Sequence, residues 1–434
     1  MKFNRWHVVL GALLIQVSLG AIYIYSVFKL PLKNHFPGWS ATDLALPAQI
    51  LLAIGALSMV AAGKIQDKIG PKKTAIIGAF ILLLGMYIAA KAQTLAQFAF
   101  GFGVLGGIGI YTAYVCPIAT CVKWFPDKRG LITGLAVAGF GAGGLVFAPL
   151  ASYLIAHIGI MSALFYLGLI YFFAIIIGAQ LMRVPPVGYC PAGWMPLVAA
   201  TNQKADFTTM EMIKNRRFWI LWFTYSIGCT AGLLVIMNLV NIWQAQAAAG
   251  FAKVTEIITA TQFSQILAQG TLAVMAVSIL NSLGRIAWGR ISDKKGREKT
   301  LMAIFALCGV MLLVLGNLDN FWSFVAAAAI IGFCFGGFLA LYPAITADYF
   351  GAKNIGANYG LMFSAYGAGG LLGPWLAPKL MAAGQSIPYE TVTGAGKNIV
   401  KLFEIGNYSI SFIFAGLMCI VAALLVSRIK TKSL

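Results

Sequence analysis

Charge is scarce in this sequence. Only 10% of its 434 residues are Asp, Glu, Lys or Arg, whereas about 25% are charged in an ordinary soluble domain. Hydrophobic residues make up 60% of the chain, and twelve apolar runs reach the roughly 20 residues needed to cross a hydrocarbon core of about 30 Å. These runs fall near 6–28, 44–63, 74–91, 96–122, 131–156, 160–182, 218–242, 265–288, 300–316, 321–346, 356–380 and 407–427. The composition predicts an all-α membrane protein with twelve transmembrane helices.

The patterns of many enzymes and metal sites are also missing. Seven cysteines stand singly and three histidines lie near span ends, so neither a disulfide framework nor a zinc site is expected. No G-x-x-x-x-G-K-[ST] loop occurs, which excludes a built-in ATPase. The glycine strings GFGVLGGIG and GFGAGG lie inside apolar runs, where close helix packing explains them. No nucleophile–base pair appears in the spans, so we expect no enzyme and no cofactor.

The basic residues are distributed unevenly. The chain has 31 Lys and Arg against 12 Asp and Glu, and with both termini inside, 23 of the basic residues fall on the inner side and seven outside. The positive-inside rule then places both termini in the cytoplasm. The excess of basic residues is thus explained by membrane orientation, and no binding of nucleic acid is expected. The first apolar run continues past Tyr25 without a small-residue cleavage site, so we expect a first span in the cell inner membrane and no cleaved signal peptide.

The sequence contains an internal duplication. GKIQDKIGPKK at 63–73 recurs as GRISDKKGREK at 289–299, and FGAGGL at 140–145 recurs as YGAGGL at 366–371, both at the same numbering offset of 226. Two halves of six spans each keep the same orientation and are related by a pseudo-twofold axis along the membrane normal. The expected division is 1–182, a cytoplasmic linker at 183–217, and 218–434.

The duplicated loop resembles the signature loop of the major facilitator superfamily, which implies that fold. The resemblance implies gating contacts at the inner face, made by tight glycine turns and by carboxylates near helix N-termini. The gating residues are Gly63, Asp67, Gly70, Gly289, Asp293, Gly296 and Arg297. GAIYIYSVF at 20–28, WFPDKRGLITGLAVAGFGAGG at 124–144 and NSLGRIAWGRISDKKGR at 281–297 resemble more narrowly the oxalate/formate antiporter family, which includes lactate and pyruvate carriers.

Arg285 is the ionisable residue that lies well inside a span. Ionisable residues there are costly and commonly functional, although this one is only eight residues from Asp293, about 12 Å of helix, so its side chain could also reach the interface. Its repeat partner is Met59, and Thr271, Ser278 and Asn281 share its helix face. A polar face ending in a guanidinium predicts a lined cavity that binds a carboxylate, with Asn281 holding either partner. The family resemblance implies the same role for Arg285.

The span-11 lysine of the family's dicarboxylate specialist is absent here. Tyr366 occupies the aligned position, and span 11 has no lysine before Lys379. One fixed charge matches one carboxylate, so a monocarboxylate such as lactate, pyruvate or formate is favoured over oxalate. Aromatic side chains are expected to complete the site, although packing or an interfacial belt is the alternative for each. The further candidates are Tyr23, Tyr111, Tyr114, Phe140, Tyr342 and Tyr366.

These features predict a secondary transporter of small organic monocarboxylates that works by alternating access. The expected partners are the substrate anion, the lipid bilayer and either protons or a counter-anion, and a monomer is expected. No acidic residue adjoins Arg285 at 282–284, so a coupled proton would follow another route. Two alternatives stay open. One is an oxalate/formate exchanger despite the missing lysine, and the other is a membrane ligand sensor that does not transport.

Overall fold

A computed structural model describes residues 4–186, 188–191, 206–252, 258–380, 382–392 and 398–429. Within those ranges, nine helices are long and apolar enough to cross a membrane. One of them, α7 (Arg129–Gln180), reverses direction at Gly159, whose φ of 75° interrupts the helix, and so supplies two passages. The bundle confirms the expected helical membrane architecture.

The first group of helices runs from α1 to α7. Its elements are α1 (Trp6–Leu19), η1 (Gly20–Ile24), α2 (Tyr25–His35), α3 (Ala41–Ile69), α4 (Pro71–Ala90), α5 (Leu95–Phe98), η2 (Ala99–Leu105), α6 (Gly106–Trp124) and α7. The first passage is thus divided by a 3₁₀ turn, and the fourth contains a π-helical stretch at η2. Several helices extend beyond the predicted apolar runs, because the polar residues at either end of a run continue the helical hydrogen bonding of the backbone.

The second group begins with α8, which lies inside the predicted linker 183–217. Its helices are α8 (Thr209–Lys214), α9 (Arg216–Ala252), α10 (Ala260–Lys295), α11 (Arg297–Leu315), α12 (Phe321–Phe350), α13 (Ile355–Leu380) and α14 (Ser409–Ser427). The short α8 starts with a capping box in which Thr208 and Glu211 bond reciprocally. The backbone N–H of Thr208 holds the pKa of the Glu211 carboxyl below its usual range, because it donates to the ionised form.

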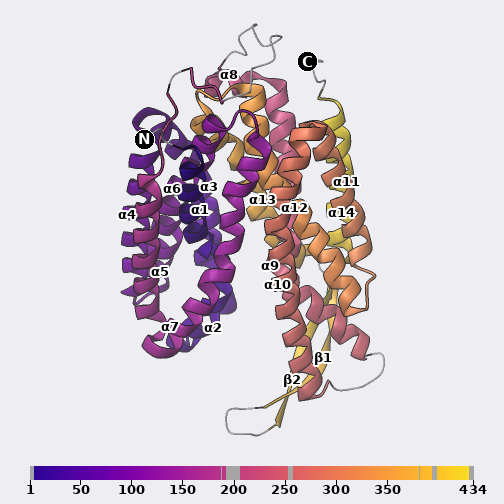
Figure 1. Ribbon diagram of the computed structural model, residues 1–434. Coiled ribbons are helices and arrows are strands. Elements are labelled where there is room, and N and C mark those ends of the chain that lie inside the picture. The colour runs from indigo at the N-terminus through magenta and orange to yellow at the C-terminus, as the bar shows by residue number, and fades with distance from the viewer. Residues whose placement is uncertain are drawn as a thin grey trace.

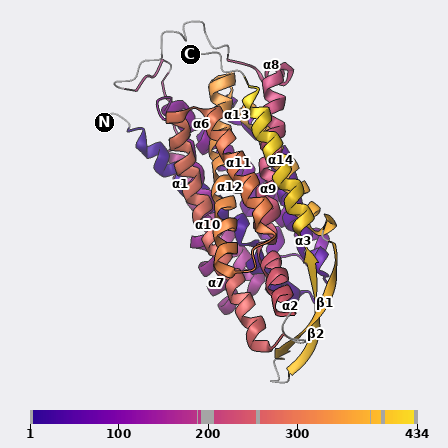
Figure 2. The same cartoon turned by 90° about the vertical axis from the view of Figure 1, so that its right-hand side faces the viewer.

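A two-stranded antiparallel ladder, β1 (Ala382–Val392) with β2 (Asn398–Asn407), lies between α13 and α14. No pattern in the sequence predicts this ladder. Figures 1 and 2 place it at the end of the bundle opposite α8, and the backbone N–H of Ile258 donates to the Pro388 carbonyl at 3.1 Å. The hairpin therefore lies outside the helical core and leaves the predicted helical bundle unchanged.

The two groups form the two halves of the molecule. Figure 1 shows their ribbons close together at the end that carries α8 and spreading apart toward β1 and β2. The first end also carries the turns after α3 and α10, where Lys68, Lys72, Lys294 and Lys295 lie, and we call it the basic end. Gly70 and Gly296 make these turns with φ of 89° and 91°, a region that glycine enters without steric cost.

Candidate functional site

The halves meet along two helix crossings that repeat each other. In one crossing α7 packs on α10, and in the other α13 packs on α3. A Cβ atom added at Gly134 would collide with the carbonyl oxygen of Arg285, and one added at Gly360 would lie 2.5 Å from that of Met59. Gly134 and Gly360 are separated by the offset of the duplication, as are Met59 and Arg285. The sequence offset is therefore reproduced in space as a pseudo-twofold contact.

Arg285 lies at the α7–α10 crossing, on the boundary between the halves. It has 0% exposed surface. One Nη donates to the Val137 carbonyl at 2.6 Å, and Nε donates to Asn281 Oδ1 at 3.2 Å. The guanidinium is thus held between Asn281 of its own helix and the backbone of α7.

The charge of Arg285 is incompletely compensated. Its second Nη is buried and has no hydrogen-bond partner among the described residues. Within the same residues its guanidinium is absent from the ion pairs, which involve Asp67, Asp127, Asp293 and Asp348. Removing a charge from water costs several kcal/mol even after relaxation. The site therefore favours an anion that brings acceptor oxygens.

The remaining predicted residues of this helix face are less directly involved. Ser278 is partly buried, and its carbonyl accepts a hydrogen bond of 3.1 Å from the Ser282 hydroxyl. The side chain of Thr271 lies outside the described residues. Ser282 lies nearer to α7, since a Cβ atom at Gly141 would collide with its Oγ atom. The structure therefore groups Asn281, Ser282 and Arg285 at the crossing.

An aromatic cluster of the first half begins beside the arginine. Phe140 lies with its ring centroid 5.9 Å from Arg285 Cζ, and Tyr114 packs edge-on against Phe140 at 5.1 Å. Tyr111 and Tyr114 both contact Phe363 of the second half, at 5.6 and 5.3 Å between centroids. These three predicted residues thus belong to one buried aromatic cluster. The side chain of Tyr23 lies outside the described residues.

The second half completes the cluster with predicted and unpredicted residues. Tyr366 stacks on Phe363 at 4.7 Å, and Tyr342 stacks on Tyr225 at 4.0 Å. The Tyr342 hydroxyl shares a hydrogen bond of 2.8 Å with Thr224. Phe363 and Tyr225 are not among the sequence candidates, because an aromatic residue in a span usually serves packing and no spacing singles these out.

Tyr359 is a further residue that sequence analysis missed. Its hydroxyl and that of Tyr225 lie within electrostatic reach of each other and of Tyr114. Neither Tyr225 nor Tyr359 makes a hydrogen bond of good geometry within the described part of the chain. Both rings pack against Phe363, at 6.4 Å for Tyr225 and 5.7 Å for Tyr359, and so belong to the same aromatic cluster.

The two duplicated loops hold the basic end together. Asp67 pairs with Lys123 at 3.3 Å and accepts from the backbone N–H of Ala357, the third residue of α13, at 2.9 Å. Asp293 accepts from the backbone N–H groups of Gly130 and Leu131, at the start of α7, both at 2.8 Å. Each carboxylate therefore binds a helix N-terminus of the opposite half, where the helix dipole favours a negative charge.

Asp348 adds a further link between the halves, one that is not among the predicted gating residues. It pairs with Arg129 of the first half at 2.7 Å and with Arg297 of the second half at 2.8 Å. Arg297 also pairs with Asp293 at 2.7 Å. Asp348 lies near the end of α12, and no motif marks its distant partner in the first half. These contacts and the Thr133 bond to the Ala340 carbonyl join the halves between the basic end and the level of Arg285.

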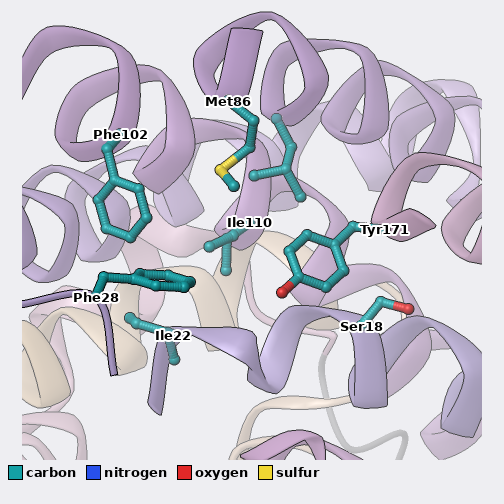
Figure 3. Close-up of a pocket in the computed structure, with 8 residues that line it drawn as sticks. Ser18, Ile22, Phe28, Met86, Phe102, Ile110 and Tyr171 are labelled. Atoms are coloured by element: carbon teal, nitrogen blue, oxygen red, sulfur yellow. The ribbon is translucent and has the colours of Figure 1, made fainter. Parts of the chain in front are cut away.

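A separate small pocket lies within the first half. Figure 3 shows its mainly apolar wall and the Tyr171 hydroxyl directed toward its interior. The lining residues are Ser18, Ile22, Phe28, Leu82, Met86, Phe102, Ile110 and Tyr171. None of them is a predicted site residue. Among the described residues, no group of three or more His, Cys, Asp or Glu side chains could hold a metal ion.

Comparison with known proteins agrees with this architecture. The family model described as "Major Facilitator Superfamily" matches residues 9–270 and 245–433. An "Uncharacterized MFS-type transporter YhjX" of Escherichia coli is 28% identical over 85% of this chain and 86% of its own length. The "Oxalate:formate antiporter" of Oxalobacter formigenes is 29% identical, covering 85% and 83% of the two chains. The "Apicoplast pyruvate carrier 1" of Toxoplasma gondii is 27% identical, covering 71% and 64%. This chain belongs to the Major Facilitator Superfamily.

Proposed function

We propose that this transporter carries small monocarboxylate anions of the lactate, pyruvate or formate type across the cytoplasmic membrane. The observation that supports it best is the buried guanidinium of Arg285, whose second Nη has no partner among the described residues. A carboxylate offers two oxygens that match the planar donor fork of a guanidinium. One carboxylate would satisfy that Nη and neutralise the charge.

The depth of Arg285 suits a transport site. Arg285 is ten residues before the end of α10 at Lys295, which corresponds to about 15 Å of helix and therefore to half of a core of about 30 Å. A site at the midplane and between the halves can be reached from either side when the halves rock. We therefore assign alternating access to this chain, with 1–182 and 218–434 as the moving units and 183–217 as the linker.

The orientation follows from the charge distribution. We place the basic end in the cytoplasm, since lysine and arginine are enriched in cytoplasmic loops. The ion pairs at that end then form the cytoplasmic gate, which is closed in this structure. The empty carrier would have to change conformation with Arg285 unpaired at the midplane, at a high electrostatic cost. Exchange of one anion for another avoids that cost.

Two relatives are named for small carboxylates, one for oxalate and formate and one for pyruvate. An oxalate/formate exchanger is therefore the second candidate. We rank it lower because span 11 has Tyr366 and no lysine before Lys379. The buried site of the described residues thus contributes one fixed positive charge, which suits a single carboxylate.

The role of Arg285 can be tested in proteoliposomes. Arg285→Gln should lower carboxylate affinity by about 30-fold or more, since losing one partner of a buried charge pair costs about 2–5 kcal/mol. Arg285→Lys should also fail, because an ammonium lacks the planar fork. The measurement is the uptake of labelled pyruvate, lactate and formate. The control is Lys91→Gln, which removes one positive charge at the exposed end of a helix.

Near-normal uptake by either arginine variant would overturn the assignment, provided that size-exclusion profiles show folded protein. A thermal-shift screen with formate, acetate, lactate, pyruvate, oxalate and malate identifies the substrate, since a ligand of the folded state raises the unfolding temperature by mass action. We expect the monocarboxylates to stabilise the protein more than oxalate and to lose that effect in Arg285→Gln. A larger shift with oxalate would favour the exchanger.

A further inference from the structure

The outer face of α10 carries a groove that is distinct from the transport site. Its lining residues are Leu283, Ile286, Ala287, Arg290, Ile291 and Lys294. The spacings of three, four, seven, eight and eleven residues from Leu283 place all six on one side of the helix. The groove is thus an apolar stripe that ends in two cations at the basic end.

This face points away from both neighbouring helices. Arg285 and Gly289 lie on the side of α10 that contacts α7, whereas Gly284 and Trp288 lie on the side that contacts α12. The groove residues occupy the remaining side, and Leu283 is 51% exposed. Because α10 spans the membrane, lipid is the medium that meets this side.

The two cations lack acidic partners within the described residues. Arg290 and Lys294 are exposed and take part in none of the ion pairs there. The neighbouring carboxylate, Asp293, is already bound to Arg297 and to the start of α7. Side chains four residues apart on a helix lie about 6 Å from each other, so both can reach one phosphate group.

The dimensions of the groove match one leaflet. From Leu283 to Lys294 there are eleven residues, or about 16 Å of helix, which is close to half of a hydrocarbon core of about 30 Å. An acyl chain can lie along Leu283, Ala287 and Ile291 while the headgroup stays at the level of the cations. A soluble anion would leave this apolar stripe uncovered.

The same pattern occurs on α3 of the first half. At the offset of the duplication, Leu57, Ala61, Lys64, Ile65 and Lys68 correspond to Leu283, Ala287, Arg290, Ile291 and Lys294. Leu57 and Ile65 are 65% and 41% exposed. Both halves thus combine exposed aliphatic side chains with two cations one turn apart.

We propose that the α10 groove binds an anionic phospholipid, with its phosphate between Arg290 and Lys294 and one acyl chain along the stripe. Basic residues at the membrane surface attract anionic headgroups, and the aliphatic wall holds the chain. The lipid would contact the helix that carries Arg285 on its opposite side. This proposal stands independently of the transported substrate.

The test measures thermal unfolding of detergent-purified protein with added phosphatidylglycerol or with phosphatidylcholine. Phosphatidylglycerol should raise the unfolding temperature more than phosphatidylcholine does. Arg290→Gln/Lys294→Gln should lose at least half of that difference, and native mass spectrometry should show one fewer retained phosphatidylglycerol. Ala287→Trp, which fills the groove but keeps both cations, should cause the same loss.

The control for charge alone is Lys72→Gln/Lys73→Gln, which removes two exposed cations at the basic end but outside the groove. An equal loss in this control would show general attraction and overturn the site. Retention of the full shift by both groove variants would also overturn it. A comparable shift with soluble glycerol 3-phosphate would indicate a phosphate site and refute lipid binding. None of these readouts depends on transport.

Discussion

Arg285 and Met59 occupy equivalent positions in the two halves, and their backbones make equivalent contacts with glycines of the opposite half. Their side chains differ completely in charge. Because the shared fold accepts methionine at this depth, packing alone does not require the arginine. Its buried Nη without a partner in the described residues connects the broken symmetry to ligand binding.

Substitution of Tyr366 can test whether the single fixed charge of the site makes the protein prefer substrates with one carboxylate. It is the repeat equivalent of Phe140, which lies beside Arg285. Tyr366→Lys should raise the ratio of oxalate to pyruvate uptake, since a second cation in the buried layer matches a second carboxylate. Competition assays in proteoliposomes measure the ratio, and Tyr366→Phe serves as the uncharged control. An unchanged ratio in the lysine variant would count against a role for Tyr366 in selectivity.

The tyrosine hydroxyls of the aromatic cluster differ in a way that can be measured. Tyr342→Phe should lower the stability of the ligand-free protein by about 1 kcal/mol, because it removes the bond to Thr224. Tyr225→Phe should leave that stability unchanged or raise it, since its hydroxyl lacks a well-formed bond within the described residues. Denaturation of both variants checks the contrast. A larger loss for Tyr225→Phe than for Tyr342→Phe would contradict it.

The crossings of α3 with α13 and of α7 with α10 are the decisive feature at the scale of elements. Glycine allows the two backbones to approach within contact distance. Gly360→Ala should destabilise the protein by about 1–3 kcal/mol, since its Cβ would lie 2.5 Å from the Met59 carbonyl and would force the helices apart.

Gly370 on the same helix provides the matched control. A Cβ added there would meet Leu233 Cδ1 at 3.6 Å, which is ordinary contact. Gly370→Ala should therefore be neutral or slightly stabilising, because alanine favours a helix by roughly 0.5–1 kcal/mol over glycine. Denaturation of both variants gives the comparison. Equal stability of the two would mean that the crossing is looser than the structure shows.

At the scale of the whole molecule, the ion pairs around Asp348 connect the halves at the basic end. Asp348→Asn removes the carboxylate shared by Arg129 and Arg297. We expect the basic end to open more often. The free-energy difference between the closed and open states should fall by about 1–2 kcal/mol, which raises the population of the open state about 5–30-fold. Spin labels attached to cysteines introduced at positions 72 and 299 report the distance between the halves. The exposed Cys190 is replaced so that it does not take up a label.

The control for that measurement is Asp127→Asn. Asp127 pairs with Arg5 at 2.8 Å, but both residues belong to the first half, so the distance between halves should not change. If Asp348→Asn leaves the distribution as it is in the unmodified protein, the ion pairs around Asp348 do not hold the gate. A shift in Asp127→Asn of equal size would point to a general loss of stability.

Much of the fold could be predicted because a bilayer imposes strict rules on sequence. Apolar runs, the constant offset between the halves and the two glycine turns are local or periodic features, and the helices α3, α4, α10 and α11 follow them closely. The hairpin β1–β2 could not be predicted, since its strands lie outside the bundle, where the hydropathy that marks membrane spans gives no signal. The roles of Asp348, Tyr225 and Tyr359 depend on partners from distant helices, which no spacing in the chain indicates.

The sequence by itself determined the membrane architecture, the duplication and the exceptional position of Arg285, because hydropathy and repeated motifs act along the chain. Only the tertiary structure decided what surrounds that arginine. Its contact with Val137, its neighbour Phe140 and the closure of the basic end by Asp67, Asp293 and Asp348 all arise between the halves. Such contacts depend on how two surfaces far apart in the chain meet, and no local pattern of residues indicates that pairing.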